Sequence, residues 1–190
     1  GDLLTAATDF NLVLNELPMR LRSGKFHAEV WNEKGRTQTT PSEISWEEFR
    51  GYRITYISTP PEIDGLLDDL WGEVQQLTLN HTISGSVEDD SDLSAWFRTL
   101  WDWENLYFYM EIRDDNLSTN SSVDHLNDGI EIYLDTDNSK SKFFGEDEFQ
   151  LRFVLNGENI YADIGAYFES ASVVQVMLED GYAVEIAIPW

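Results

Sequence analysis

The chain has 190 residues, of which 42% are hydrophobic and 13% aromatic, enough to pack one domain and to exclude a disordered chain. Thirty-six carboxylates against 12 lysines and arginines give a formal net charge of −24. Because phosphate contacts need clustered cations, this charge argues against nucleic acid and anionic membranes as partners. Cysteine is absent, which excludes disulfides, and no apolar run reaches the about 20 residues of a membrane span.

Short segments bounded by turn residues predict strands along most of the chain. The first are "KFHAEVWNEKG" at 25–35 and "YRITYIS" at 52–58. The segment "IDGLLDDLWGEV" at 63–74 contains the only predicted helical turn, near residues 65–72. "SAWFRTLWD" at 94–102 is the next predicted strand.

The clearest strand is "NLYFYMEIRD" at 105–114, because its apolar and polar residues alternate with the two-residue period of a half-buried strand. "DGIEIYLDTD" at 128–137 and "EFQLRFVLNG" at 148–157 alternate in the same way. The side chains predicted to face the core are Leu106, Phe108, Met110 and Ile112 in the first strand, Ile130, Ile132 and Leu134 in the second, and Phe149, Leu151 and Phe153 in the third.

The end of the chain, "SVVQVMLEDGYAVEIAIPW" at 172–190, predicts a hairpin whose turn is Glu179-Asp180-Gly181. The Asp-Gly pair is expected to supply the positive-φ residues of a tight turn. Tyr182, Val184, Ile186 and Ile188 are expected to face inwards. Many short strands without a βαβ rhythm predict an all-β fold, an antiparallel β-sandwich of jelly-roll-like, immunoglobulin size with at most one short helical turn.

Five ordered blocks resemble the family 9 carbohydrate-binding modules: "PPEIDGLLDDLW", "AWFRTLWDWENLYFYMEIRDDNL", "NDGIEIYLDTDN", "DEFQLRFVLNG" and "GYAVEIAIPW". The family's pattern opens on Ile-Asp-Gly-x-x-Asp-x-x-Trp and closes with a late Glu-x-x-Ile-Pro-Trp. The resemblance covers residues 60–190 and implies a non-catalytic β-sandwich that binds oligo- or polysaccharide, with structural calcium, as an accessory module of a glycoside-degrading system. The implied location is extracellular, periplasmic or at the cell surface.

Members of the family continue through further strands after the Ile-Pro-Trp block, where this sequence stops. Residues 1–58 are similar to that closing part, so we expect one domain over residues 1–190 in which 1–58 supplies the closing strands and 60–190 the opening strands, in circularly permuted order. The alternative is the tail of one module followed by the head of the next.

The resemblance also implies a sugar site. Glu131 matches the family's sugar-binding acid and Arg152 its arginine, and both have the polar parity of their strands. One tryptophan of the family's two-tryptophan clamp falls at His125, and Trp46 is either the other clamp residue or the tryptophan of the family's structural Ser-Trp pair. Gln150 and Tyr133 share the faces of Arg152 and Glu131. The alternative is an exposed cross-strand Glu–Arg pair with no ligand, worth under about 1 kcal/mol.

Calcium is predicted in the loop "RDDNLSTNSSVDHLND", because clustered Asp and Asn oxygens are ligands for hard cations. The candidate ligands are Asp114, Asp115 and Asp128, of which Asp114 and Asp128 match the family's metal-binding and capping acids. A merely solvated acidic loop is the alternative. Asp64 and Asp68 resemble the family's structural acids, which turn the chain at its opening.

Three other functions were weighed. Catalysis is disfavoured because no pattern places two carboxylates in one cleft and no Ser, His and Asp set is apparent. Haem ligation by Met110 or Met177 with His125 is disfavoured because Met110 has apolar parity. A structural or protein-interaction domain that has lost sugar binding is the main alternative.

Overall fold

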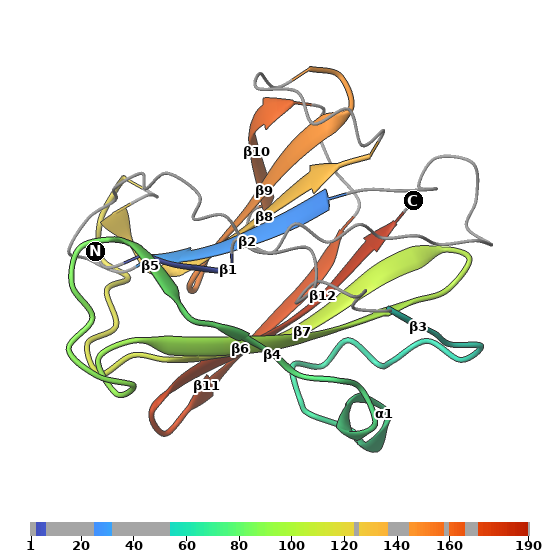
Figure 1. Ribbon diagram of the computed structural model, residues 1–190, viewed down its shortest axis with the longest axis horizontal. Helices are drawn as coiled ribbons and strands as arrows, with labels where there is room; N and C mark the ends of the chain where they lie inside the picture. The colour runs from blue at the N-terminus through green and yellow to red at the C-terminus, as the bar shows by residue number, and fades with distance from the viewer. Residues whose placement is uncertain are drawn as a thin grey trace, which may run out of the picture.

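The computed structural model describes residues 3–6, 25–31, 54–123, 126–136, 145–157, 160–165 and 171–189. In this part of the chain, two sheets face one another (Figure 1). The first sheet has the strand order β10-β9-β8-β2-β1-β5, and the second has the order β11-β12-β7-β6-β3, with β4 also paired to β6. No helix within these ranges is long and apolar enough to cross a membrane.

The first sheet consists of β1 (Leu3–Ala6), β2 (Lys25–Trp31), β5 (His81–Ser84), β8 (Gly129–Asp135), β9 (Glu148–Val154) and β10 (Ile160–Gly165). The second consists of β3 (Thr55–Tyr56), β4 (Leu77–Leu79), β6 (Ser94–Trp101), β7 (Asn105–Arg113), β11 (Ser172–Leu178) and β12 (Gly181–Pro189). The single helix among the described residues is α1 (Asp69–Gly72), where a helical turn was predicted. The β-sandwich prediction is confirmed.

One edge departs from the antiparallel prediction. Of the predicted strand 52–58, the described residues 54–58 form only the two-residue strand β3, which pairs in parallel with the end of β6 through Thr55 opposite Leu100 and Tyr56 opposite Trp101. All other strand pairs that the structure describes are antiparallel. A segment that runs beside β6 in the same direction can pair with it only in parallel. The alternation of apolar and polar residues does not predict the direction of a strand.

The core lies between the sheets and consists of the residues that alternation placed inwards. Ile130 and Ile132 of β8 and Leu151 of β9 are fully buried, and Leu134 is 8% exposed. On the second sheet, the inward residues Leu106, Phe108, Met110, Ile112, Tyr182, Val184, Ile186 and Ile188 are each at most 4% exposed. Phe149 is only partly buried at the edge of this core.

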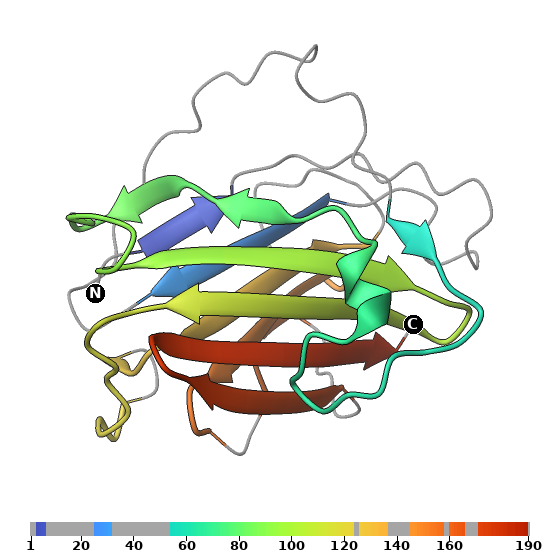
Figure 2. The same cartoon turned by 90° about the horizontal axis from the view of Figure 1, so that it is seen from below.

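The outer face of the second sheet is buried as well, which the alternation did not predict. Tyr107 and Tyr109 have the polar parity of β7, yet each is 2% exposed. They belong to a second apolar cluster with Trp71 of α1, and α1 lies on the outer side of this sheet (Figures 1 and 2). The sandwich therefore has a covering segment, residues 62–72, which we call the opening loop.

The Glu185 carboxylate holds the opening loop against β12. Its Oε2 accepts hydrogen bonds from the backbone N–H groups of Asp64, at 2.9 Å, and Gly65, at 2.8 Å. Its Oε1 accepts from the indole N–H of Trp71, at 2.8 Å. Glu185 has no exposed surface, so these three donors replace the water that a carboxylate requires. This contact joins the Ile-Asp-Gly-x-x-Asp-x-x-Trp block to the Glu-x-x-Ile-Pro-Trp block.

Two further acids shape the opening loop locally. Asp64 accepts a hydrogen bond from the Leu66 N–H, at 2.9 Å, which closes a turn. Asp68 is the N-cap of α1 and accepts from the N–H groups of Leu70, at 2.8 Å, and Trp71, at 3.2 Å. Both therefore have the structural role that the resemblance implied, and Asp68 orients Trp71 towards Glu185.

The predicted C-terminal hairpin is present, but its turn differs from the prediction. Leu178 pairs with Gly181, so the loop residues are Glu179 and Asp180. Gly181 has a φ of +151°, and Asp180 is not among the described residues with positive φ. A side chain at Gly181 would collide with the Ile112 carbonyl oxygen of β7, so close packing between β12 and β7 requires glycine there.

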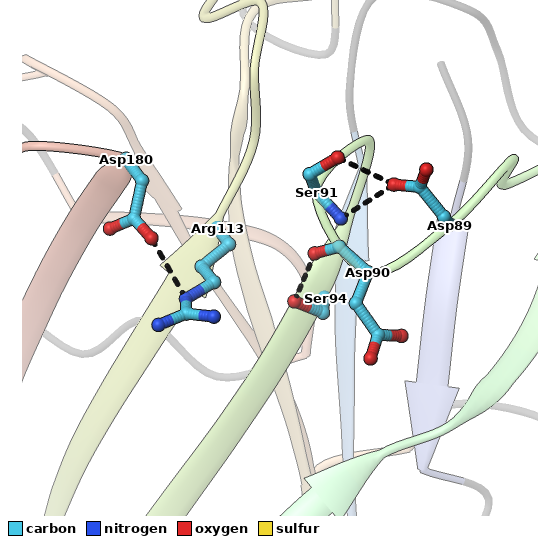
Figure 3. A network of polar contacts seen from close by, with 6 residues as sticks. All are labelled: Asp89, Asp90, Ser91, Ser94, Arg113 and Asp180. Carbon is cyan, nitrogen blue, oxygen red and sulfur yellow. Dashed lines mark hydrogen bonds and ion pairs between the residues drawn. The ribbon is translucent and has the colours of Figure 1, made fainter.

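Exposed polar contacts fix the turns at one end of the second sheet (Figure 3). Before β6, Asp89 accepts hydrogen bonds from the Ser91 hydroxyl, at 2.5 Å, and the Ser91 N–H, at 2.8 Å, and these bonds hold the pKa of Asp89 below its ordinary value. At the end of β7, Arg113 Nε lies 3.0 Å from Asp180 Oδ2. This ion pair is solvent-exposed and adds little to stability.

The N-terminal strands lie within the first sheet. β2 pairs with β8 over its full length, and β1 pairs with both β2 and β5. β8 is thereby an interior strand, with β9 on its other side. The permuted order of residues 1–58 and 60–190, as opposed to a tandem pair, stays a prediction.

Replacing Glu185 by alanine is expected to lower the free energy of unfolding by about 3 kcal/mol or more, because three buried donors lose their acceptor. Urea denaturation followed by tryptophan fluorescence measures this change. The matched control is Glu179→Ala, which removes an exposed carboxylate from the turn leading into β12 and should change stability by less than about 0.5 kcal/mol. Equal effects of the two substitutions would contradict the account.

The variant Glu185→Gln adds a pH readout. Burial raises the pKa of Glu185, and the hydrogen bonds from Trp71, Gly65 and Asp64 only partly oppose this rise. The folded protein therefore binds the proton more tightly than the unfolded chain, so this group's contribution to stability falls as pH rises from the ordinary glutamate pKa through the raised one. The free energy of unfolding of the wild type, minus that of Glu185→Gln, should therefore decrease as pH rises across that window.

Candidate functional site

The outer face of β8 and β9 carries four polar residues in two directly opposed pairs. Antiparallel pairing places Glu131 opposite Arg152 and Tyr133 opposite Gln150. Their apolar neighbours along each strand fill the core, so alternation directs these four to the other side of the sheet. We call Glu131, Tyr133, Gln150 and Arg152 the polar network.

Hydrogen bonds connect all four members of the polar network. Arg152 Nε donates to Glu131 Oε1 at 2.6 Å, and the Tyr133 hydroxyl donates to Glu131 Oε2, also at 2.6 Å. Gln150 Nε2 donates to the Tyr133 hydroxyl oxygen at 2.9 Å. Both carboxylate oxygens of Glu131 are thus held in place before any ligand binds, which reduces the ordering cost of recognition.

The polar network is buried, which contradicts the alternative of an exposed cross-strand pair. Glu131 is 2% exposed, Gln150 is 3% exposed and Arg152 is 7% exposed. A charged pair removed from water is expensive unless every partner is well placed. Because substitution of both charges by apolar residues would often be neutral for stability, the fold alone does not explain why a carboxylate and a guanidinium occupy these positions.

The network offers the chemistry that recognises hydroxyl groups. A carboxylate accepts hydrogen bonds, a guanidinium donates them, and the amide and phenol do both. Sugar hydroxyls also donate and accept, so such a set can pair with two or more hydroxyls of one ring. Of the predicted stacking residues, Tyr133 is the one that lies in the described part of the chain. It belongs to this network, and its hydroxyl donates to Glu131. His125 and Trp46 lie outside the described residues.

The acidic loop between β7 and β8 uses two of its predicted metal ligands to cap its own backbone. Asp114 Oδ1 accepts from the Asn116 N–H, at 2.9 Å, and Asp128 Oδ2 accepts from the Ser118 N–H, at 2.6 Å. Both aspartates are buried, whereas Asp115 is exposed. Within the described ranges, no three acidic or histidine side chains converge as a metal site does.

Tyr182 lies near this loop, a position that the sequence did not reveal. Its side chain is 1% exposed, and its hydroxyl has no hydrogen-bond partner among the described residues. Burial raises its pKa, and the charges of Asp128 and Asp114 raise it further. Alternation correctly placed Tyr182 inwards, but the pairing of β12 with β7 that brings it to this loop has no local signature.

Comparison with known proteins places the chain among carbohydrate-binding domains. Residues 63–190 match the sequence profile of the family described as "Carbohydrate family 9 binding domain-like". Endo-1,4-beta-xylanase A of Thermotoga neapolitana is 32% identical over 130 residues, which cover 68% of this chain and 12% of that enzyme. Exoglucanase XynX of Acetivibrio thermocellus is 29% identical over 166 residues, covering 85% of this chain and 15% of that enzyme.

Solved structures of family 9 carbohydrate-binding modules match the fold. A module from Caldicellulosiruptor kristjanssonii in complex with glucose has a TM-score of 0.63 and 27% identity over 72% of this chain and 67% of that one. The same module in complex with cellotriose has a TM-score of 0.62 over 71% of this chain. The chain spans only 12% to 15% of the two enzymes named above, and the family matched is one of binding domains, as predicted, rather than of catalytic domains.

A double-mutant cycle measures what the buried ion pair contributes. Arg152→Met is expected to lower the free energy of unfolding by about 3 kcal/mol or more, because it leaves the Glu131 carboxylate buried without its cation. Adding Glu131→Gln to Arg152→Met should recover part of this loss. Additive losses, measured by chemical denaturation of the two single variants and the double variant, would show that the two charges do not interact.

Proposed function

The chain belongs to the carbohydrate family 9 binding domain-like family, and from this membership we propose that it binds neutral carbohydrate as a non-catalytic module. The observation that carries the proposal is the buried Glu131–Arg152 pair, with Tyr133 and Gln150 attached to it. A net charge of −24 favours uncharged ligands over acidic polysaccharides. The relatives are named as xylanases and an exoglucanase, so cello- and xylo-oligosaccharides are the first ligands to test.

We assign the hydroxyl contacts to the polar network. Glu131 accepts from sugar hydroxyls, while Arg152 and Gln150 donate to them. Stacking is assigned to Tyr133, His125 and Trp46, and an imidazole at residue 125 offers less apolar area than the tryptophan of the family's clamp. With histidine at residue 125, we expect binding that is weaker than in a module with two tryptophans, whichever role Trp46 has. The proposed location is outside the cell, where polysaccharide is encountered.

Glu131→Gln is expected to weaken binding of cello- or xylo-oligosaccharide about tenfold or more, because a charged acceptor is lost from the sugar contact. Isothermal titration calorimetry with a panel of both series measures the affinity. Glu111→Gln is the matched control, since Glu111 lies on β7 of the opposite sheet and accepts from Tyr109. Wild-type protein that binds none of the sugars would favour an interaction domain.

A structural calcium at the acidic loop is a second proposal. Asp114 and Asp128 would hold it, because both are carboxylates buried at the two ends of this loop. Two carboxylates leave the remaining oxygen ligands to backbone carbonyls or water. A bound calcium would neutralise two buried charges and fix the loop that leads into β8.

If calcium binds at this loop, thermal unfolding in excess chelator should occur at a lower temperature than in millimolar calcium, because an ion that binds only the folded state stabilises it. Differential scanning fluorimetry of wild type and Asp128→Asn measures the shift. The substitution should abolish most of the calcium dependence. Identical melting curves of the wild type in calcium and in chelator would exclude the site.

A further inference from the structure

An exposed group of aromatic rings lies at the turn between β6 and β7, away from the polar network. Trp103 in the turn is 55% exposed, and Tyr56 of β3 is 44% exposed. Trp101, at the end of β6, is 6% exposed and lies beneath them in the sheet. We call these three residues the aromatic cluster. Figure 2 shows β3 beside the end of β6, at the end of the second sheet where this turn lies.

The three rings contact one another edge to face. The ring centroids lie 4.9 Å apart for Tyr56 and Trp101, 5.8 Å for Trp101 and Trp103, and 6.0 Å for Tyr56 and Trp103. The interplanar angles lie between 63° and 77°. Parallel stacking would hide the flat faces of the rings against each other, whereas this arrangement leaves apolar ring surface open to solvent.

The turn that carries Trp103 is rigid. Asp102 Oδ1 accepts from the N–H groups of Glu104, at 2.7 Å, and Asn105, at 2.8 Å. Asp102 Oδ2 accepts from the Tyr107 hydroxyl at 2.7 Å, and the Asn105 amide donates to that hydroxyl at 3.0 Å. Burial and the Asp102 carboxylate raise the pKa of Tyr107 to about 12. These bonds fix the backbone of the turn, and the ring contacts with Trp101 and Tyr56 restrict the orientation of the Trp103 side chain.

The surroundings of the cluster select the chemistry of its partner. Asp102 and Glu104 flank Trp103 in sequence, and the whole chain is strongly acidic, so anionic groups are repelled. Carboxylates beside an aromatic surface suit a partner with apolar C–H faces and hydroxyl donors, which is a neutral pyranose. Trp103 lies in a turn and is 55% exposed, so its ring can meet residues within a polysaccharide chain and does not require a chain end.

We propose that the aromatic cluster is a second carbohydrate contact, in which Trp103 and Tyr56 stack on internal pyranose residues of a neutral polysaccharide. This inference rests on the proposed sugar-binding function, but it concerns different residues on the other sheet. The polar network recognises hydroxyls of a short sugar, while the aromatic cluster increases the affinity for long chains. Two contacts on one module raise retention on a polymer without changing the affinity for a monosaccharide.

The test compares short and long ligands in the same variants. Retention on insoluble cellulose and on insoluble xylan is measured by depletion, and binding of glucose, xylose and their disaccharides by calorimetry. Trp103→Ala should lower the affinity for polymer about fivefold or more and leave disaccharide binding unchanged. Trp103→Phe should restore most of the retention. Leu66→Ala is the matched control, because Leu66 is also 55% exposed but belongs to the opening loop.

Each outcome separates the two proposals. If Glu131→Gln abolishes disaccharide binding while Trp103→Ala leaves polymer retention intact, the aromatic cluster proposal is overturned and the polar network stands. If Trp103→Ala abolishes polymer retention while Glu131→Gln leaves disaccharide binding unchanged, the polar network proposal is overturned and the aromatic cluster stands. A change in sedimentation coefficient with Trp103→Ala, at unchanged retention, would identify the cluster as a self-association surface and overturn the sugar contact. Wild-type protein that binds neither polymer nor short sugar would overturn both proposals.

Discussion

The buried carboxylate of Glu185 is the contact on which the second sheet depends. It lies on β12 and receives three donors from a segment about 120 residues earlier in the chain. Without an acceptor there, the opening loop would have to leave two backbone N–H groups and an indole unsatisfied or move into solvent. Trp71 would then no longer cover Tyr107 and Tyr109, and the outer face of the sheet would be exposed.

The two sheets use buried carboxylates in different ways. On the second sheet, Glu185 accepts only N–H groups of the protein, so its hydrogen bonds serve the fold. On the first sheet, Glu131 is held by a guanidinium and a phenol, side chains that themselves carry the hydrogen-bonding groups suited to a ligand. Each buried charge requires fixed partners. Around Glu131 on the first sheet, these partners are polar side chains gathered on one face of the sheet. Geometry therefore separates a structural acid from a candidate binding acid in the same molecule.

Strand positions and inward side chains followed from the sequence because alternation and burial have the same period. Parity placed Glu131 and Arg152 on the polar faces of their strands, and the structure adds the register that sets them directly opposite one another. The burial of Tyr107 and Tyr109 could not be predicted, because it depends on the opening loop, which packs over the sheet from elsewhere in the chain. The burial of the Glu131–Arg152 pair has no local signature in the sequence either. The hydrogen-bond partners of Glu185 could not be predicted either. An acid on a buried strand is unusual, but the sequence does not indicate which groups it contacts. Trp103 was overlooked because the turn Asp-Trp-Glu-Asn reads as a loop, although a large aromatic at a turn tip is itself a signal.

We propose that a neutral sugar binds on the outer face of β8 and β9. Nuclear magnetic resonance of ¹⁵N-labelled protein titrated with cello-oligosaccharide, or with xylo-oligosaccharide if calorimetry favours it, tests this residue by residue. Progressive shifts are expected at low ligand concentration for the Arg152 Nε–H, the Gln150 side-chain amide and the backbone N–H groups of Glu131 and Tyr133. Saturable shifts confined to other residues, with these signals unmoved, would contradict it.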